Sequence, residues 1–161
     1  MNKILIFIIC LIICFIPAII GSYFTSEAIP TWYETIEKPS FNPPSWIFGP
    51  VWTILYITMG ISLYFIVTSK IKNSIAIYFF FTQLILNGLW SILFFGMQNL
   101  LLAFIGILFL WVFILTTIIT SAKVSKISSL ILIPYFFWVS FATILNYSIL
   151  ILNWKIFNFF T

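Results

Sequence analysis

Residues Leu100–Ser121 read LLLAFIGILFLWVFILTTIITS and contain no charged side chain. At a rise of about 1.5 Å per residue, a helix of about 20 residues crosses the hydrocarbon core of a bilayer. A run of this length and composition therefore predicts a transmembrane helix. Four further runs have the same character, and the five predicted spans are approximately residues 4–24, 46–68, 75–95, 100–121 and 129–152.

The composition of the whole chain agrees with a membrane protein. Hydrophobic residues make up 63% of the 161 residues, charged residues only 6%, and the mean hydropathy is +1.23. Such a chain lacks the polar surface that a water-soluble domain needs. Because lipid offers no hydrogen-bond partners, each span must be a helix, and the runs lack the alternation of a β-barrel. We predict an all-α integral membrane bundle of five transmembrane helices, forming one domain over residues 1–161.

The first run has a competing interpretation as a signal peptide, because Lys3 precedes it. The run is long, contains Pro17 and lacks a clear cleavage site, so we favour a membrane span. Its two cysteines, Cys10 and Cys14, are expected to be buried as small apolar residues. Because the chain has no histidine, we expect no metal site around them.

The lysines predict the orientation of the bundle. With the N-terminus inside, five lysines face the cytoplasm and two lie outside, as the positive-inside rule requires. The inner five are Lys3, Lys70, Lys72, Lys123 and Lys126, and the outer two are Lys38 and Lys155. The three glutamates and the C-terminus then lie outside. The lysines that give the net charge of +4 are sparse and lie between apolar runs, so we expect no nucleic-acid binding.

The connection between the first two spans, residues 25–45, is longer than the others and unusual in composition. Its prolines stiffen an extended path, and they are Pro30, Pro39, Pro43 and Pro44. It also contains aromatic residues that a passive linker does not need, namely Trp32, Tyr33 and Phe41. Two interpretations remain open: an interfacial segment at the level of the headgroups, or a lid over a cavity.

Aromatic and amide side chains recur at helical spacing in three spans. The sets are Trp52, Tyr56 and Met59; then Gln83, Asn87 and Trp90, flanked by Ser91; then Trp138, Ala142 and Leu145, beside Asn146. Spacing of i, i+4 and i+7 puts each set on one helix face. One such stripe usually reflects packing between helices. Three stripes with amides favour a pocket for an apolar, planar ligand.

Two further features constrain the function. No acid, lysine or histidine lies within a span, which argues against ion-coupled transport and removes acid–base and nucleophilic catalysis. Pro134 lies one turn before Trp138, and we expect it to kink or open the fifth helix; Pro17 is a candidate for the same effect in the first.

Several segments carry a family signature. Residues 32–33 read WY, residues 38–46 KPSFNPPSW and residues 48–56 FGPVWTILY. Residues 87–91 read NGLWS, residues 94–95 FF, residues 134–138 PYFFW and residues 141–146 FATILN. In this order, the segments closely resemble the tryptophan-rich sensory protein (TspO/MBR) family, which includes the mitochondrial translocator protein.

The resemblance implies a five-helix bundle, often a homodimer, in which the first loop caps a ligand cavity. Family members bind porphyrins, some bacterial ones are reported to break down protoporphyrin in light, and mitochondrial ones bind cholesterol and drugs. The implied ligand-binding residues are Tyr33, Trp52, Tyr56, Asn87, Trp90, Ser91, Trp138, Ala142 and Leu145. Trp52 and Trp138 are the residues implied in the photochemistry, in the role of catalytic residues.

The last helix departs from the sterol pattern proposed for mitochondrial members. Leu145 and Tyr147 are present, but the next basic residue is Lys155, which is too far along the chain. We therefore do not expect a sterol-specific role. Because no histidine is available as an axial ligand, we expect metal-free porphyrin to bind better than haem, and we expect no resident cofactor.

The sequence thus predicts a protein of a bacterial-type cell membrane that binds porphyrin-type tetrapyrroles in an aromatic intramembrane pocket. Its expected role is sensing or regulation, or light-dependent degradation of protoporphyrin. Its expected partners are a porphyrin or another apolar planar ligand, membrane lipid and a second copy of the chain. The alternative is a passive transporter or scaffold for an apolar ligand such as a lipid or a sterol.

Overall fold

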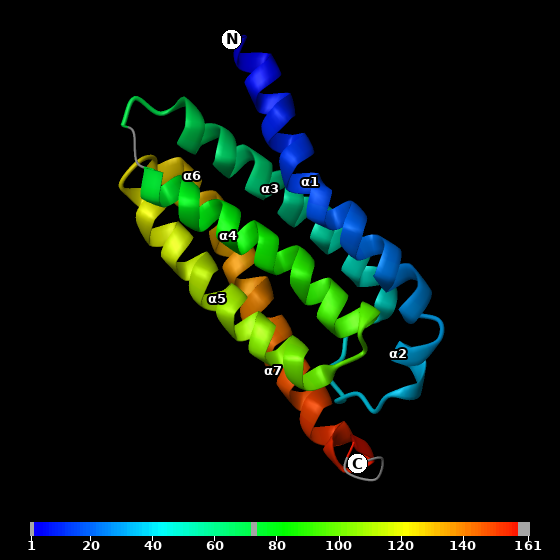
Figure 1. The fold of residues 1–161 in the computed structure, drawn as a ribbon. Helices are drawn as coiled ribbons and strands as arrows, with labels where there is room; N and C mark the ends of the chain where they lie inside the picture. Colours follow the sequence, from blue (N-terminus) through cyan, green and yellow to red (C-terminus); the bar gives the residue numbers. More distant parts are fainter. Residues whose placement is uncertain (1, 72–73, 158–161) are drawn as a thin grey trace.

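The computed structural model describes residues 2–71 and 74–157, and the regular elements in these ranges are all helices. Figure 1 shows an elongated bundle of long helices that lie side by side. The long helices are α1 (Lys3–Ala28), α3 (Phe48–Thr68), α4 (Ser74–Ser91), α5 (Leu100–Ala122) and α7 (Ile133–Phe157). The short ones are α2 (Trp32–Thr35), the 3₁₀ helix η1 (Ser45–Ile47), the π-helix η2 (Ile92–Gly96) and α6 (Lys126–Ile131).

Five helical segments are long and apolar enough to cross a membrane. They are Lys3–Ala28, Ser45–Thr68, Ser74–Gly96, Leu100–Ala122 and Lys126–Trp154. The prediction of an all-α membrane bundle with five transmembrane helices is therefore confirmed. Large apolar side chains face outward along these helices, for example Ile19 and Ile85, each 68% exposed, as expected where lipid is the solvent.

The first helix continues past its predicted end at Phe24 to Ala28. The residues beyond the apolar run are polar, but their hydroxyls bond back to the helix itself. Ser22 Oγ donates to the Ile19 carbonyl at 2.9 Å, and Thr25 Oγ1 donates to the Gly21 carbonyl at 2.8 Å. Because these hydroxyls need no partner outside α1, the helix continues although its sequence becomes polar after Phe24.

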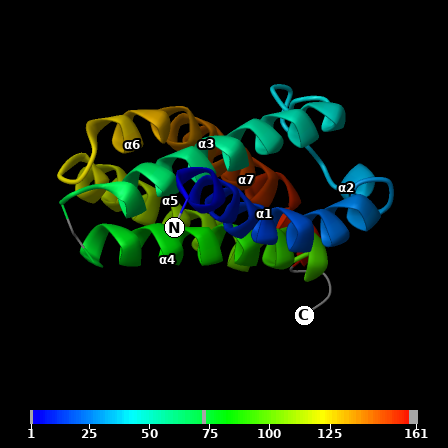
Figure 2. The same ribbon diagram turned by 90° about the horizontal axis from the view of Figure 1, so that it is seen from above.

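Helix α1 packs against α3 and α4, while α5 packs against α4 and α7; Figure 2 shows the bundle from above. Two glycines allow α1 to approach its neighbours closely. A Cβ atom on Gly60 would lie 2.6 Å from Leu11 Cδ2, and one on Gly88 would lie 3.1 Å from Pro17 Cβ. Close packing of this kind is what holds membrane helices together, since lipid is as apolar as the side chains.

Proline shapes the last span as expected. Helix α6 ends at Ile131, Leu132 forms a turn, and α7 begins at Ile133, directly before Pro134. Because proline lacks an N–H group, residue 134 cannot donate to the carbonyl one turn earlier. The predicted irregularity at this position is confirmed, whereas α1 continues through Pro17 as one helix.

The two ends of the bundle differ in charge. Lys3 begins α1 and Lys70 follows α3, at the end of the bundle where α3 leads to α4, whereas Glu27 and Glu34 belong to the end of α1 and to α2, at the opposite end (Figure 1). This separation agrees with the segregation of charge that the sequence predicts, except that Lys72 lies outside the described residues. Which end faces the cytoplasm stays a prediction.

Candidate ligand-binding site

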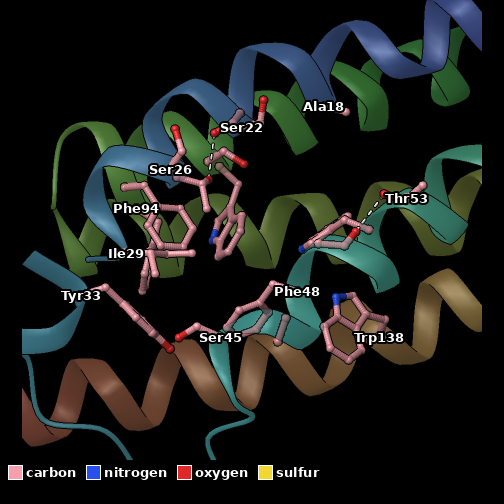
Figure 3. A pocket seen from close by; sticks show the side chains of 18 of the residues that line it. Ala18, Ser22, Ser26, Ile29, Tyr33, Ser45, Phe48, Thr53, Phe94 and Trp138 are labelled. Carbon is pink, nitrogen blue, oxygen red and sulfur yellow. Dashed lines mark hydrogen bonds between the residues drawn. The ribbon is translucent and has the colours of Figure 1, made fainter. Parts of the chain in front are cut away.

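A cavity of about 460 Å³ lies at the α2 end of the bundle. Side chains from α1, α2, α3, η2 and α7 project into this space (Figure 3), and α4 adds its last turn. The described residues that line it are mostly aromatic or hydroxylic, and none of them is an acid or a lysine. Its volume falls within the range of about 300–1,000 Å³ that is typical of small-molecule sites.

The structure brings nearly all the expected ligand-binding residues to this one cavity. Those that line it are Tyr33, Trp52, Tyr56, Trp90, Ser91, Trp138, Ala142 and Leu145. The exception is Asn87, which is buried behind the wall. Asn146, which the spacing placed beside the stripe of the fifth span, also lines the cavity. That these residues bind a ligand stays a prediction.

Of the four tryptophans that line the cavity, Trp52, Trp90 and Trp138 lie on three different long helices. The ring centroid of Trp52 (α3) lies 6.5 Å from that of Trp90 (α4), with an angle of 31° between the planes. The ring of Trp138 (α7) packs against that of Phe48, at a centroid distance of 6.4 Å. The walls therefore offer several flat π-faces, which is the surface that a planar apolar molecule stacks on.

A chain of hydrogen bonds behind the wall fixes Tyr56 and explains the position of Asn87. The Tyr56 hydroxyl donates to Asn87 Oδ1, and Asn87 Nδ2 donates to the Tyr135 hydroxyl at 3.0 Å. Tyr135 in turn donates to Gln83 Oε1 at 3.0 Å. These groups join α3, α4 and α7, and a satisfied buried network of this kind makes the packing specific. Asn87 thus acts on the cavity by positioning the Tyr56 ring.

Tyr33 lines the cavity from the long connection between α1 and α3. Its side chain is only 2% exposed, and its ring packs 5.9 Å from Phe95 and 6.2 Å from Phe94. Its hydroxyl donates to Asn42 Oδ1 at 2.7 Å. This bond links two parts of the same connection, because Asn42 lies nine residues further along it. Burial raises the pKa of Tyr33 to about 12, although the bond to Asn42 lowers it, so the phenol stays neutral at physiological pH.

Asn153 of α7 fastens the same connection to the bundle. Its Oδ1 accepts a hydrogen bond from the Glu37 backbone N–H at 3.0 Å, and its Nδ2 donates to the Glu37 carbonyl at 2.9 Å. The amide side chain therefore pairs with both backbone groups of one residue. Of the two interpretations of residues 25–45, these contacts favour a cover held over the cavity.

The first helix contributes to the cavity, which the sequence did not predict. Its lining residues are Phe15, Ala18, Gly21, Ser22, Thr25 and Ser26. Their spacing does place them on one face, but α1 is apolar on every side until Ser22, so periodicity gave no contrast. The signal that could have found this face is the hydroxyl set Ser22, Thr25 and Ser26, at i, i+3 and i+4.

Comparison with known proteins places this bundle in a family. Residues 8–152 match the model of the TspO/MBR family, and this range contains all the described cavity residues. The chain belongs to the TspO/MBR family. The resemblance seen in the sequence is therefore confirmed, and the cavity lies in the part of the chain that matches the TspO/MBR family model.

Relatives in the TspO/MBR family come from distant organisms. Tryptophan-rich protein TspO of Chlorobaculum tepidum is 45% identical over 157 residues, which cover 95% of this chain and 99% of that protein. Tryptophan-rich protein TspO of Archaeoglobus fulgidus is 47% identical over 139 residues, which cover 83% and 87%. The Translocator protein of Homo sapiens is 33% identical over 136 residues, which cover 81% and 79%. This chain is thus an integral membrane protein of the TspO/MBR family.

Proposed function

We propose that the cavity binds a porphyrin-type tetrapyrrole. The observation that carries this proposal is that indoles of Trp52, Trp90 and Trp138 line one apolar cavity from three helices. A porphyrin is a flat, largely apolar macrocycle, and stacking on aromatic rings contributes about 0.5–1.5 kcal/mol per pair beyond the burial of area. The size of the cavity and its uncharged lining suit such a ligand.

The lining supports a preference for metal-free porphyrin over haem. Haem iron is usually held by histidine, cysteine, methionine or tyrosine. The described lining residues include none of the first three, and the hydroxyls of the two lining tyrosines, Tyr33 and Tyr56, already donate to Asn42 and Asn87. Burial of the iron would therefore gain no strong axial ligand here, and the macrocycle itself has to provide the affinity.

The same geometry supports a light-dependent role. An indole next to an excited porphyrin can donate one electron, so that the indole is oxidised and the macrocycle is reduced. Trp52 and Trp138 line the cavity from different helices, α3 and α7, so a bound macrocycle can contact an indole from each. The proposed role is therefore sensing of protoporphyrin or its light-dependent degradation.

Titration of purified protein with protoporphyrin tests the binding proposal. Tryptophan emission should fall in a saturable way with a micromolar or lower Kd, because the macrocycle lies beside three indoles. Haem should bind more weakly than protoporphyrin. A linear, unsaturable decrease would contradict binding at a defined site, and tighter binding of haem would contradict the assigned preference.

Release of the loop should speed up ligand dissociation. Asn153→Leu removes both hydrogen bonds to Glu37 and leaves that peptide group without its partner. Two such bonds contribute about 1–3 kcal/mol, so the dissociation rate of protoporphyrin should rise about tenfold. Stopped-flow recovery of tryptophan emission measures it.

Ser148→Ala is a suitable control for this variant, because the Ser148 hydroxyl donates only within α7, to the Ile144 carbonyl. Its dissociation rate should equal that of the unmodified protein. Equal rates in Asn153→Leu and Ser148→Ala would show that residues 25–45 do not retain the ligand.

A further inference from the structure

Helices α1 and α3 contact each other in a regular antiparallel register over the half of α1 that is distant from α2. The ring centroids of Phe7 and Tyr64 lie 5.6 Å apart, and those of Phe15 and Tyr56 lie 5.8 Å apart. The close approach at Gly60 lies midway between these two contacts. Each turn forward along α1 is therefore matched by one turn backward along α3.

The same register, continued towards α2, places small residues opposite one another. In the order of the pairs, they are Ala18, Ser22 and Ser26 of α1 and Thr53, Gly49 and Ser45 of α3 and η1, and all six line the cavity. Small residues usually let membrane helices approach closely. Here, however, a Cβ atom on Gly49 would have no neighbouring atom within 4 Å, so the two helices do not close at this point. We call the space between these six residues the α1–α3 slot.

The slot is the open side of the cavity. All the exposed residues among the described lining belong to α1, η1 or α3, and they are Ser22, Ser26, Ser45, Trp46, Gly49 and Thr53. The lining residues of α4, η2 and α7 are buried or half-buried. In Figure 3, Ser22 on α1 and Thr53 on α3 lie at the border of the cavity. The cavity therefore opens sideways, between α1 and α3.

This opening lies within the segments that are able to cross a membrane. The α1 residues of the slot belong to Lys3–Ala28, and the others belong to Ser45–Thr68. The slot contains no charged residue, and the hydroxyls of Ser22, Ser26 and Thr53 donate to carbonyls of their own helices at 2.9, 3.1 and 2.9 Å. Because these hydrogens are already bonded, the slot presents a weakly polar surface that lipid tolerates.

The cover formed by residues 25–45 contrasts with this open side. Tyr33 is only 2% exposed, and the Asn153 amide holds the cover through both backbone groups of Glu37. The cavity is thus closed where the cover lies over it and open where it faces lipid. An apolar ligand is concentrated in the bilayer, so the open side is also the side on which the ligand is found.

We propose that the ligand enters the cavity from the bilayer through the α1–α3 slot, and that the slot also holds a hydrocarbon tail of the ligand. This inference rests on the proposed function and specifies its ligand further, as a planar macrocycle that carries an alkyl chain. Such a chain leaves the cavity through the slot and lies among lipid acyl chains. The cavity therefore does not need room for it.

Two esters of one porphyrin test the place of the tail. The monomethyl and monohexadecyl esters of mesoporphyrin differ only in chain length, and both dissolve in phosphatidylcholine vesicles that contain the protein. Quenching of tryptophan emission gives a Kd for each, expressed as a mole fraction of lipid. The two values should agree within about threefold, because the long chain stays in lipid. Binding of the hexadecyl ester that is weaker by about tenfold or more would overturn the inference.

A phenylalanine in the slot tests the route. Gly49→Phe places a ring in open space, and Ser22→Phe does so from the opposite helix. Each variant should slow association and dissociation of the methyl ester about tenfold, since an obstacle on the route raises the barrier in both directions. The hexadecyl ester should in addition lose about tenfold in affinity, because its tail competes with the ring. Stopped-flow quenching in vesicles measures the rates.

Ile54→Phe is the matched control, because Ile54 follows Thr53 directly but is 60% exposed and does not line the cavity. Both rates and both affinities should equal those of the unmodified protein. Unchanged rates in Gly49→Phe and Ser22→Phe would exclude the slot as the route. Equal slowing by Ile54→Phe would assign the effect to α3 as a whole and overturn the inference as well.

The outcomes distinguish this inference from the proposed function. If neither ester binds, the proposed function fails and the inference fails with it. If the methyl ester binds in a saturable way and the hexadecyl ester does not, the proposed function stands and only the slot is overturned.

Discussion

Ala142→Trp should weaken protoporphyrin binding at least about a hundredfold and leave the fold intact. Ala142 lies on the α7 face that lines the cavity, one turn beyond Trp138. An indole at this position would occupy the space of the ligand, and the loss corresponds to about 2.7 kcal/mol of binding free energy. The new side chain enters existing space, so the strain of an overpacked core is largely avoided. Quenching of tryptophan emission and a binding isotherm measured from porphyrin absorbance both report the loss.

Ile144→Trp is the matched control for this experiment. Ile144 is on the same helix, only two residues away, but it is 60% exposed on the outer face. An added indole there meets lipid and should leave the Kd unchanged. Equal weakening by the two variants would mean a general disturbance of α7, and full affinity in Ala142→Trp would place the ligand elsewhere.

The double variant Trp52→Phe with Trp138→Phe should lose at least about nine-tenths of the light-dependent consumption of protoporphyrin. Phenylalanine keeps an aromatic face in each wall, so binding should fall only about two- to fivefold. It is a much poorer electron donor than indole, so transfer to the excited macrocycle should largely stop. The rate of porphyrin loss under constant illumination, divided by the bound fraction, separates the two effects.

Trp154→Phe provides the comparison, because Trp154 is 45% exposed near the end of α7 and does not line the cavity. Its illuminated rate should match that of the unmodified protein. No loss of pigment in the unmodified protein would limit the role to binding. Loss that continues in the double variant would exclude these two indoles as the donors.

The sequence predicted the spans well because their cause is local. Each apolar run must be a helix in lipid, whatever its neighbours are. Spacing also placed the cavity side chains on common faces, but it could not tell which members of a stripe reach the cavity. Met59, Gln83 and Asn87 share faces with Trp52 or Trp90, yet they are buried between helices. A stripe runs along the whole helix, whereas the cavity occupies one end of the bundle.

Other features depend on contacts between distant parts of the chain. The pairing of Asn153 with Glu37 joins residues that are 116 positions apart, and no local pattern indicates it. The cavity face of α1 is hidden for a different reason, since a helix that is apolar all round has no periodic contrast. Within the part of the chain that the structure describes, Trp138 Nε1 and Asn146 Nδ2 are buried without a hydrogen-bond partner, which only the folded arrangement of neighbours can reveal.

An experimental structure of the protein with protoporphyrin bound would test the central claim most directly. We expect the macrocycle inside the cavity, in contact with both Trp52 and Trp138 and covered by Tyr33. A macrocycle found on the lipid-facing surface of the helices, with the cavity holding none, would contradict the proposal.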